Sequence, residues 1–566
     1  MRRIAFILLC AAALHAAGQT RAPGVAAAPD VVSIDVNLAR PVGAYKTITN
    51  WFGYDESNYT TMPYGEQLLG ELRSVSAAPV TIRAHHLLTS GNGVPELKWS
   101  SSNVFSLDEN GKPIYDFTIT DRTFDEFVRA GVRPMVELGF MPKDLAAAVP
   151  GIHEYQLHYP AHTMAGASNN PPRDYAMWGE LVRKYTEHLV ERYGREQVST
   201  WYFEVWNEPD IEYWHGTPAE YFKLYDYAVA GVRAALPGAK VGGPASTGPG
   251  NAKARAFLES FLEHCLHDKS AADGKTVPLD FISFHPKGRP VLVDGHVRMG
   301  LANELQAAEA GFRIVAAHAE LKHLPIILSE ADPEGCAACS AKENPANAYR
   351  NGPLYAAYTA TAVKALFDLE DKDDVNLIAM LSWSFEFEDK PYFEGYRTLA
   401  TNGIDKPILN LFRMTGMMAG ERVLTTSTGA VALEELVEKG VRQGPDVNAL
   451  ATKSEREAAV MVWNYHDDDA AAPAAEVQVT IAGIPPGVKR VLLEHYRIDE
   501  THSNAFTAWR QMGSPQAPTA EQYARLKAAG QLELMTSPEW LDVDGGKVRV
   551  ETVLPRQAVS LLRLEW

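Results

Sequence analysis

The sequence is poor in cysteine and in positive charge. Four cysteines occur among 566 residues, too few for a scaffold held together by disulfides. Lysine and arginine number 53 against 71 aspartates and glutamates, which gives a formal net charge of −18. A surface of that sign repels nucleic acid. We therefore expect no nucleic-acid partner, and a neutral ligand fits the composition better.

Two kinds of cofactor motif are also missing. The sequence contains no glycine-rich loop of the phosphate-binding type and no HExxH pair, so it predicts neither a nucleotide nor a metal cofactor. Cys336 and Cys339 supply two ligands where a structural zinc site needs four. In an oxidising compartment they could instead close a small disulfide, and no thioredoxin-like pattern surrounds them. Cys265 lies in a helical pattern and is expected to be a core thiol.

Long hydrophobic runs are absent beyond the N-terminus. A charged start at residues 1–3 is followed by an apolar run at 4–14 and by small residues at 16–18. This pattern is typical of a secretory signal peptide over residues 1–19, and a buried N-terminal helix is the alternative. A leucine stands before Cys10 where a lipoprotein has a small residue, so no lipid anchor is predicted. We expect an exported protein, periplasmic or extracellular, with no membrane association after cleavage.

A chain of this length exceeds one compact core, so more than one domain is expected. From about residue 48 to 415, short apolar runs alternate with amphipathic segments such as Tyr175–Tyr193, whose apolar residues repeat at helical spacing. Eight strands are predicted, near 50–53, 80–83, 134–138, 201–206, 240–243, 281–284, 326–328 and 378–383. Repeated strand–helix units of this number predict an α/β fold with a (β/α)₈ TIM barrel over residues 47–418.

After about residue 420 the pattern changes to short segments in which apolar and polar residues alternate. Such alternation predicts antiparallel strands, here at 459–463, 476–481, 490–493 and 558–564. Residues 33–38 alternate in the same way ahead of the barrel. We therefore expect residues 30–46 to contribute a strand to an accessory antiparallel β-sandwich that is otherwise formed by residues 419–566.

Two glutamates directly follow predicted barrel strands. In a barrel of this kind, polar residues at the carboxyl ends of strands line the active-site mouth. Glu208 follows strand 202–205 within Trp-Asn-Glu-Pro, and Glu330 follows strand 326–328 within Ser-Glu-Ala-Asp-Pro. Two carboxyls presented by different strands are what cleavage of a glycosidic bond requires. Glu204 and Glu137 lie within strands and are expected to be structural.

The segment Phe203–Pro209 closely resembles the acid/base motif of glycoside hydrolase family 39. That family consists of retaining (β/α)₈-barrel enzymes and includes β-xylosidases and α-L-iduronidases. Further similar blocks occur in the family's order and cover most of residues 35–566, at Trp51–Glu56, Arg83–His85, Leu138–Pro142, Asp280–His285, Ser329–Pro333 and Tyr496–Asp499. The resemblance implies that Glu208 is the general acid/base and Glu330 the nucleophile of a retaining exo-glycosidase.

Further residues are candidates for binding or support. Asn207 resembles the residue that hydrogen-bonds the sugar 2-hydroxyl, with a strand-end cap as the alternative. His85 and His285 could bind sugar hydroxyls or orient the nucleophile, and each could equally be a core histidine. Arg83 is expected to support the site by fixing the charge of the nucleophile or of another carboxylate by bidentate bonding. Trp383 offers a flat face for a sugar ring, or it belongs to the barrel core.

The sequence favours an oligosaccharide substrate but leaves the sugar open. Similarity to bacterial xylosidases of the family favours β-xylosidase activity and release of xylose from the non-reducing end. Lys287 and Arg397 resemble residues that hold a uronate carboxylate, which favours α-L-iduronidase activity. Three acidic residues expected at the rim, Glu386, Glu388 and Asp389, would repel an anionic sugar.

We therefore rank xylose first. His86 and residues 89–93 depart from the pattern of the family's xylosidases, so α-L-arabinosidase activity stays open. A non-catalytic carbohydrate-binding protein is the alternative from another class. The sequence leaves the oligomeric state open.

Overall fold

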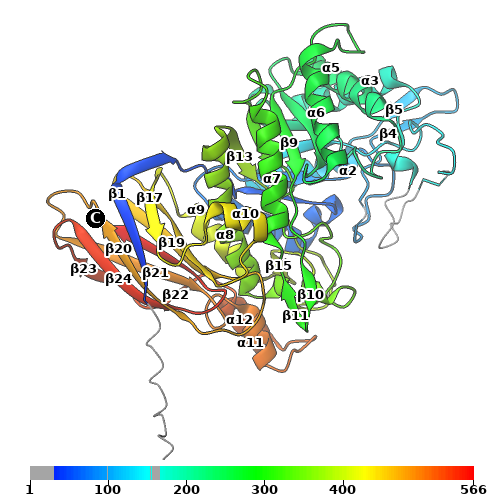
Figure 1. The fold of residues 1–566 in the computed structure, drawn as a ribbon. Helices are drawn as coiled ribbons and strands as arrows, with labels where there is room; N and C mark the ends of the chain where they lie inside the picture. Colours follow the sequence, from blue (N-terminus) through cyan, green and yellow to red (C-terminus); the bar gives the residue numbers. More distant parts are fainter. Residues whose placement is uncertain (1–30, 99, 153, 156–165) are drawn as a thin grey trace, which may run out of the picture.

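The computed structural model describes residues 31–98, 100–152, 154–155 and 166–566. The predicted signal peptide lies outside these residues. Figure 1 shows two parts side by side, a barrel surrounded by helices and a β-rich part that is built mainly from the C-terminal third of the chain. The first strand, drawn in blue, belongs to the β-rich part, as the alternation at residues 33–38 predicts.

The barrel is one sheet of parallel strands in the order β13-β12-β9-β8-β7-β6-β3-β2-β14. β13 and β14 follow one another along the chain, and β14 pairs with β2, so the sheet closes. The eighth strand is interrupted at Leu381, so it carries two labels, β13 and β14. The eight predicted strands are confirmed. The strands are β2 (Trp51–Tyr54), β3 (Thr81–Ala84), β6 (Arg133–Leu138), β7 (Tyr202–Val205), β8 (Lys240–Thr247), β9 (Phe281–His285), β12 (Pro325–Leu328), β13 (Asn376–Met380) and β14 (Ser382–Trp383).

Helices cover the outside of the barrel (Figure 1). The predicted helix is present as α3 (Tyr175–Tyr193), which begins because the Asp174 side chain accepts hydrogen bonds from two backbone amides of the first turn. It ends at Gly194, whose φ of 87° a glycine adopts readily. The other long helices are α1 (Pro63–Ser74), α2 (Thr118–Ala130), α5 (Pro218–Ala235), α6 (Ala252–His267), α7 (Leu301–Ala316), α8 (Pro353–Asp373) and α9 (Pro407–Gly416).

The barrel interior changes from apolar to polar along the strands. One cluster of buried side chains contains Trp51, Met135, Tyr202, Phe281 and Ile327. Successive side chains of a strand point to opposite faces, so the residue two positions further on points the same way. Those next residues are Gly53, Glu137, Glu204, Ser283 and Ser329. These five side chains therefore close the amino-terminal end of the barrel, and a polar interior begins directly above them.

The β-rich part is a ten-stranded sheet in the order β22-β21-β25-β19-β18-β17-β1-β20-β24, with β23 paired to β21. Strands from both ends of this order share one hydrophobic cluster, so the sheet folds over itself as a sandwich. Its strands are β1 (Val32–Ala44), β17 (Glu421–Ser427), β18 (Asp446–Lys453), β19 (Glu457–Tyr465), β20 (Ala475–Ala482), β21 (Arg490–Ile498), β22 (Glu533–Leu534), β23 (Glu539–Asp542), β24 (Lys547–Leu554) and β25 (Val559–Glu565).

The prediction of a purely antiparallel sandwich is wrong in one pairing. β1 runs antiparallel to β17 but parallel to β20. It enters the sheet from before the barrel and fills the position between these two strands, which run in opposite directions beside it. The sheet is therefore mixed. A strand that precedes the barrel in the sequence joins strands that follow it.

Shorter elements complete the fold. Within the β-rich part, α10 (Leu433–Lys439), α11 (Ala505–Gln511) and α12 (Ala520–Ala529) interrupt the strands. On the barrel side these elements are η1 (Ser57–Thr61), β4 (Phe105–Leu107), β5 (Pro113–Tyr115), η2 (Ala167–Asn169), α4 (Arg195–Val198), β10 (Val291–Val293), β11 (His296–Arg298), η3 (Pro345–Asn351), β15 (Ala400–Thr401) and β16 (Ile404–Asp405). α11 and α12 pack their side chains against Phe393 and Ile404 of the barrel loop that follows β14.

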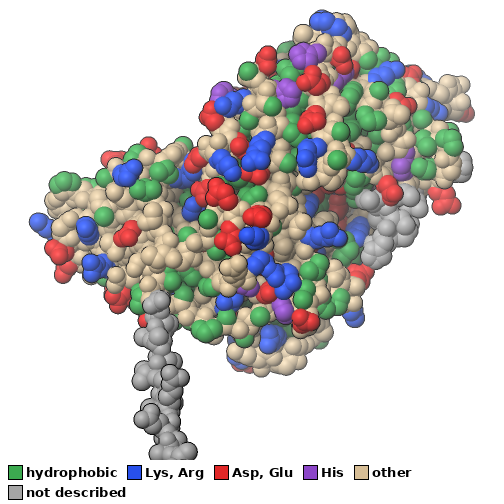
Figure 2. Space-filling model, viewed as in Figure 1, with side chains coloured by type: hydrophobic (Ala, Val, Ile, Leu, Met, Phe, Trp, Pro, Cys, Tyr) green, Lys and Arg blue, Asp and Glu red, His purple; other side chains and the backbone are tan. Residues whose placement is uncertain are grey.

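Two further observations concern the helices and the surface charge of the described residues. Among the described helices, none combines the length and the apolar character that a membrane crossing requires. Figure 2 shows acidic and basic side chains interspersed over the face in view. Cys265 of α6 is buried, as expected for a core thiol.

Ile34 of β1 tests how far the N-terminal strand stabilises the sandwich. Its side chain is fully buried in the sandwich core, between Ser427 of β17 and Val479 of β20. Ile34→Ala should lower the free energy of unfolding by about 2–5 kcal/mol, because the cavity adds to the lost apolar burial. Val42→Ala, at a position that is 49% exposed in the same strand, is the control. Equal urea midpoints for the two variants would contradict this account.

Candidate active site

The two glutamates predicted from the strand ends meet in the barrel mouth. Glu208 lies three residues beyond β7, and Glu330 lies two residues beyond β12. A carboxylate oxygen of Glu208, a carboxylate oxygen of Glu330 and a ring nitrogen of His285 all lie within 4.8 Å of one another. The Glu208 side chain is 14% exposed and that of Glu330 is 7% exposed. Glu208 is therefore the more accessible member of a closely spaced carboxyl pair.

The backbone around Glu208 is held in an unusual conformation. Trp206 and Glu208 have φ angles of 72° and 44°, in the left-handed region that residues other than glycine seldom adopt. The Glu208 amide donates to the Ala245 carbonyl at 2.8 Å, and the Trp206 indole donates to the Tyr213 carbonyl at 2.9 Å. Neighbouring loops thus fix this turn, as is typical of a functional position.

Arg83 of β3 lies at the centre of the site and is fully buried. Its Nε donates to Glu204 at 2.5 Å, and its Nη2 lies 3.1 Å from a carboxylate oxygen of Glu137. Its Nη1 donates to Oε1 of Glu330 at 3.1 Å, and Nη2 donates to Oδ1 of Asn207 at 3.0 Å. Arg83 thus supports Glu330 through one bond and not through a bidentate pair. With Oδ1 facing the guanidinium, the Asn207 amide nitrogen is the group left to donate to a ligand.

Positive charge keeps Glu330 ionised. Burial by itself raises the pKa of Glu330, but the surrounding positive charge, that of Lys287 first, outweighs burial and holds that pKa well below its usual range. The Lys287 ammonium donates to Oε2 of Glu330 at 2.8 Å and to Asp332 at 3.4 Å. Lys287 is therefore a partner of the predicted nucleophile.

The environment of Glu208 favours the protonated form. Burial and then the negative charge of Glu330 raise the pKa of Glu208 to about 8. Its Oε1 lies 3.0 Å from Nδ1 of His285, whose Nε2 lies 3.0 Å from the Ser329 hydroxyl. Burial, with the charges of Arg83 and Lys287, lowers the pKa of His285 to about 3. At neutral pH His285 is uncharged and positions Glu208 through a hydrogen bond.

His85 has a different role from His285. Burial lowers its pKa, but Glu137 and Asp55 outweigh that effect and raise the pKa to about 10. Its Nδ1 lies 2.7 Å from Asp55, and its Nε2 lies 3.0 Å from Glu137 and 3.6 Å from Glu330. Both ring nitrogens thus face carboxylates, which favours orientation of the nucleophile over binding of sugar hydroxyls.

Trp383 and Arg397 are both buried. Trp383 is 2% exposed, and its ring packs against the Arg83 guanidinium and the His85 ring. The ring thus lies beside two residues of the site, and its role as a platform for a sugar stays a prediction. Arg397 is fully buried, donates to the carbonyls of Trp383 and Glu334, and pairs with the Glu334 carboxylate at 2.9 Å. Arg397 is thus already engaged by Glu334, and a role in holding a substrate carboxylate stays a prediction.

A family profile described as Glycosyl hydrolases family 39 matches residues 82–541. This chain belongs to glycosyl hydrolase family 39. A β-xylosidase of Caldicellulosiruptor saccharolyticus is 27% identical over 466 residues, which cover 80% of this chain and 84% of the relative. An α-L-iduronidase of Mus musculus is 26% identical over 377 residues, which cover 62% of this chain and 56% of the relative.

The fold of this family member is also found among solved structures. The crystal structure of a monomeric β-xylosidase from Caulobacter crescentus CB15 aligns with a TM-score of 0.73 at 21% identity, and the alignment covers 94% of this chain and 99% of that one. The two chains therefore share one fold over nearly their whole length. The chain is a glycosidase, and the identity of its sugar is a separate question.

Asp332 and Asp55, which contact other side chains of the site, were not singled out from the sequence. Asp332 accepts hydrogen bonds from the Trp383 amide at 2.9 Å and the Tyr355 hydroxyl at 3.2 Å, and it also contacts Lys287. Asp55 pairs with His85. Both lie inside segments that resemble family blocks, and that position was the available signal. Their function depends on contacts between loops that sequence spacing does not reveal.

A disulfide stiffens the loop that follows Glu330 in this glycosidase. Cys336 and Cys339 are joined, with their Cα atoms 5.5 Å apart, so neither is a zinc ligand. The buried Arg350 donates to the carbonyls of both cysteines at 2.6 Å and pairs with Glu334 at 2.8 Å. The loop is thereby tied to η3 and to the network that contains Asp332.

Glu208, His285 and Glu330 present three potential metal ligands within 4.8 Å of one another. A cation at this point would meet Lys287 at one Glu330 oxygen and Arg83 at the other. Both cations would repel it. The arrangement therefore suits a reacting carboxyl pair better than a metal.

Replacement of Arg83 tests its central role in this family 39 site. Arg83→Met should lower the free energy of unfolding by about 3–5 kcal/mol, because it leaves buried carboxylates without their cation. The matched control is Arg129→Met, since the Arg129 side chain is 60% exposed and pairs with Glu126 on the surface. That change should cost less than about 1 kcal/mol. Similar urea midpoints for the two variants would count against the assignment.

Proposed function

We propose that this family 39 glycosidase is a retaining exo-β-xylosidase that releases xylose from the non-reducing end of xylo-oligosaccharides. The observation that carries the retaining assignment is the spacing of Glu208 and Glu330, whose nearest carboxylate oxygens lie within 4.8 Å. Retaining glycosidases hold their carboxyls about 5–5.5 Å apart, whereas inverting enzymes need about 6.5–9.5 Å to admit a water. The opposite pKa shifts of the two groups supply one acid and one nucleophile.

The reaction follows from these two environments. The Glu330 carboxylate attacks the anomeric carbon while protonated Glu208 gives its proton to the glycosidic oxygen, and the bond to the leaving group breaks. Bond formation removes the charge of Glu330, which is the second cause of the raised pKa of Glu208. Glu208 can then accept a proton from water, which attacks the same carbon and releases the sugar.

The contacts around the mouth favour a neutral sugar. Lys287 already donates to Glu330 and Asp332, so a uronate carboxylate would compete with Glu330 for it. Arg397 is buried. Glu386, expected to repel anions at the rim, is instead 2% exposed, and burial raises its pKa well above the usual range. Glu388 is half-buried and Asp389 is exposed, so their predicted repulsion of an anion stands. The β-xylosidase relative also covers more of the chain than the α-L-iduronidase does.

We also propose that the protein is exported. The support is the signal-like sequence before residue 20 and the disulfide between Cys336 and Cys339, since disulfides persist mainly in oxidising compartments. Fractionation of cells that produce the full chain should recover it outside the cytoplasm, shortened at its N-terminus. Recovery of the uncleaved chain in the cytoplasm would refute this proposal.

The substrate assignment is tested with p-nitrophenyl β-D-xyloside, p-nitrophenyl α-L-arabinoside and a chromogenic α-L-iduronide in parallel. The xyloside should be hydrolysed fastest. Glu208→Gln should lower kcat for hydrolysis by about 100- to 10,000-fold, because water needs a general base to release the sugar from Glu330, and Glu330→Ala should abolish turnover. If the iduronide or the arabinoside is hydrolysed faster, that sugar replaces xylose in the substrate assignment. Sugar binding without hydrolysis of any glycoside would favour the non-catalytic alternative.

The pH profile tests the two ionisation states. The rate should fall as pH rises through about 8, because Glu208, whose pKa is raised to that value, then loses its proton. Glu330 should stay ionised down to acid pH, because its pKa is held below the usual range. Lys287→Met should move the acid side of the kcat/KM profile to higher pH, and the exposed Lys269→Met should leave it in place. A profile that Lys287→Met does not shift would contradict this electrostatic assignment.

A further inference from the structure

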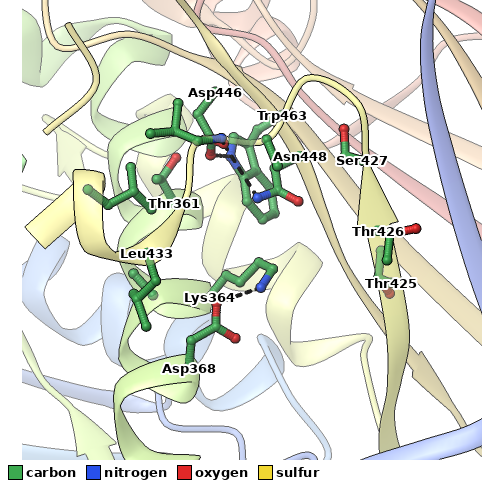
Figure 3. A pocket seen from close by; sticks show the side chains of 14 residues that line it. Thr361, Lys364, Asp368, Thr425, Thr426, Ser427, Leu433, Asp446, Asn448 and Trp463 are labelled. Atoms are coloured by element: carbon green, nitrogen blue, oxygen red, sulfur yellow. Dashed lines mark hydrogen bonds and ion pairs between the residues drawn. The ribbon is translucent and has the colours of Figure 1, made fainter. Parts of the chain in front are cut away.

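A second hollow lies between the barrel and the sandwich, away from the catalytic pair. It has a volume of about 300 Å³ and is lined by α8 on the barrel side and by β17, α10, β18 and β19 on the other. Figure 3 shows Lys364 and Asp368 of α8 across the hollow from Thr425 and Thr426 of β17, with Trp463 and Asn448 above them. Ligand sites occur preferentially where domains meet, and this volume is at the lower end of their usual range.

The charges that border this hollow balance one another. Lys364 pairs with Asp368 at 2.6 Å, and their side chains are 20% and 36% exposed. Asp446 is 1% exposed and already accepts from the Trp463 indole and from the Val431 amide, both at 2.8 Å. A cation would therefore meet Lys364, and an anion would meet Asp368. The balance favours a neutral ligand.

The remaining lining suits a ligand with many hydroxyl groups. The half-buried Thr425 hydroxyl donates to a backbone carbonyl, so its oxygen remains able to accept. The Ser427 hydroxyl already donates to a carbonyl and accepts from the Gly429 amide, and Thr361 is buried. The Lys364 ammonium has three hydrogens and Asp368 has two oxygens, of which their ion pair uses part. Carbon atoms of the half-buried Leu433 add an apolar surface, and the Trp463 ring is buried beneath the hollow. Donors, acceptors and an apolar patch in one small hollow match the two-sided character of a sugar ring.

We propose that this hollow is a second saccharide-binding site that takes a short neutral oligosaccharide independently of the active site. It lies along α8, whose Thr361, Lys364 and Asp368 face it from successive turns. Pro353, at the start of this helix, is eleven residues before Lys364, a distance of about 16 Å along the axis. The hollow is thus displaced toward the amino-terminal end of the barrel and uses none of the residues around Glu330.

Calorimetric titration of the Glu330→Ala variant with xylotriose tests the proposal without any turnover. Two binding events are expected. Ala430 is exposed and lines the hollow, so adding Ala430→Trp should fill the hollow and remove one event. Ala474→Trp, at an exposed loop position outside the hollow, is the matched control and should keep both. Lys364→Met should weaken the second event about tenfold, as loss of one hydrogen bond to a charged group predicts.

A single binding event in Glu330→Ala that Ala430→Trp leaves unchanged would overturn the proposal, and so would the absence of binding. Hydrolysis of p-nitrophenyl β-D-xyloside by the otherwise unaltered chain separates this result from the proposed function. Ala430→Trp should leave that hydrolysis unchanged, because the small glycoside needs only the active site. Loss of hydrolysis in Ala430→Trp but not in Ala474→Trp would show that the hollow is not independent of the active site.

Discussion

The buried guanidinium of Arg83 is the interaction on which the active site depends. Glu137 and Glu204 lie opposite each other on adjacent strands β6 and β7, without exposure to solvent. Two carboxyls in that position would repel each other and lose their hydration. Arg83 lies between them and also reaches Glu330. One cation on a barrel strand thus makes a polar barrel interior tolerable and ties it to the reacting group.

The same arrangement explains how two glutamates acquire opposite properties. Glu330 lies next to cations on both of its oxygens, Arg83 on one and Lys287 on the other. Glu208 has a neutral histidine, His285, as its neighbour and faces the charge of Glu330. Chemistry that needs one acid and one base can therefore use a single residue type. The difference lies in where the cations are, and those cations are held by carboxylates that take no direct part.

Local patterns predicted the parts of this structure that depend on neighbouring residues in sequence. The helix Tyr175–Tyr193 agrees with its prediction at both ends, because its cap and its apolar spacing are encoded within it. The eight strands and the positions of Glu208 and Glu330 follow from strand-end placement and from motifs of a few residues. Burial of Trp383 and Arg397 did not follow, because it is decided by loops far away in sequence. The parallel pairing of β1 depends on which C-terminal strands flank it.

Helix α8 links the features that the sequence left separate. Its Tyr355 donates to Asp332, which holds Lys287 against Glu330, and its Lys364 borders the hollow beside the sandwich. Most of its side chains are buried, because the barrel and the sandwich pack on it from different sides. A helix enclosed in this way holds the two places at a fixed separation. An oligosaccharide bound at the hollow would therefore raise the local concentration of sugar chains near the barrel. The active site would then bind substrate more often without any new contact at Glu330.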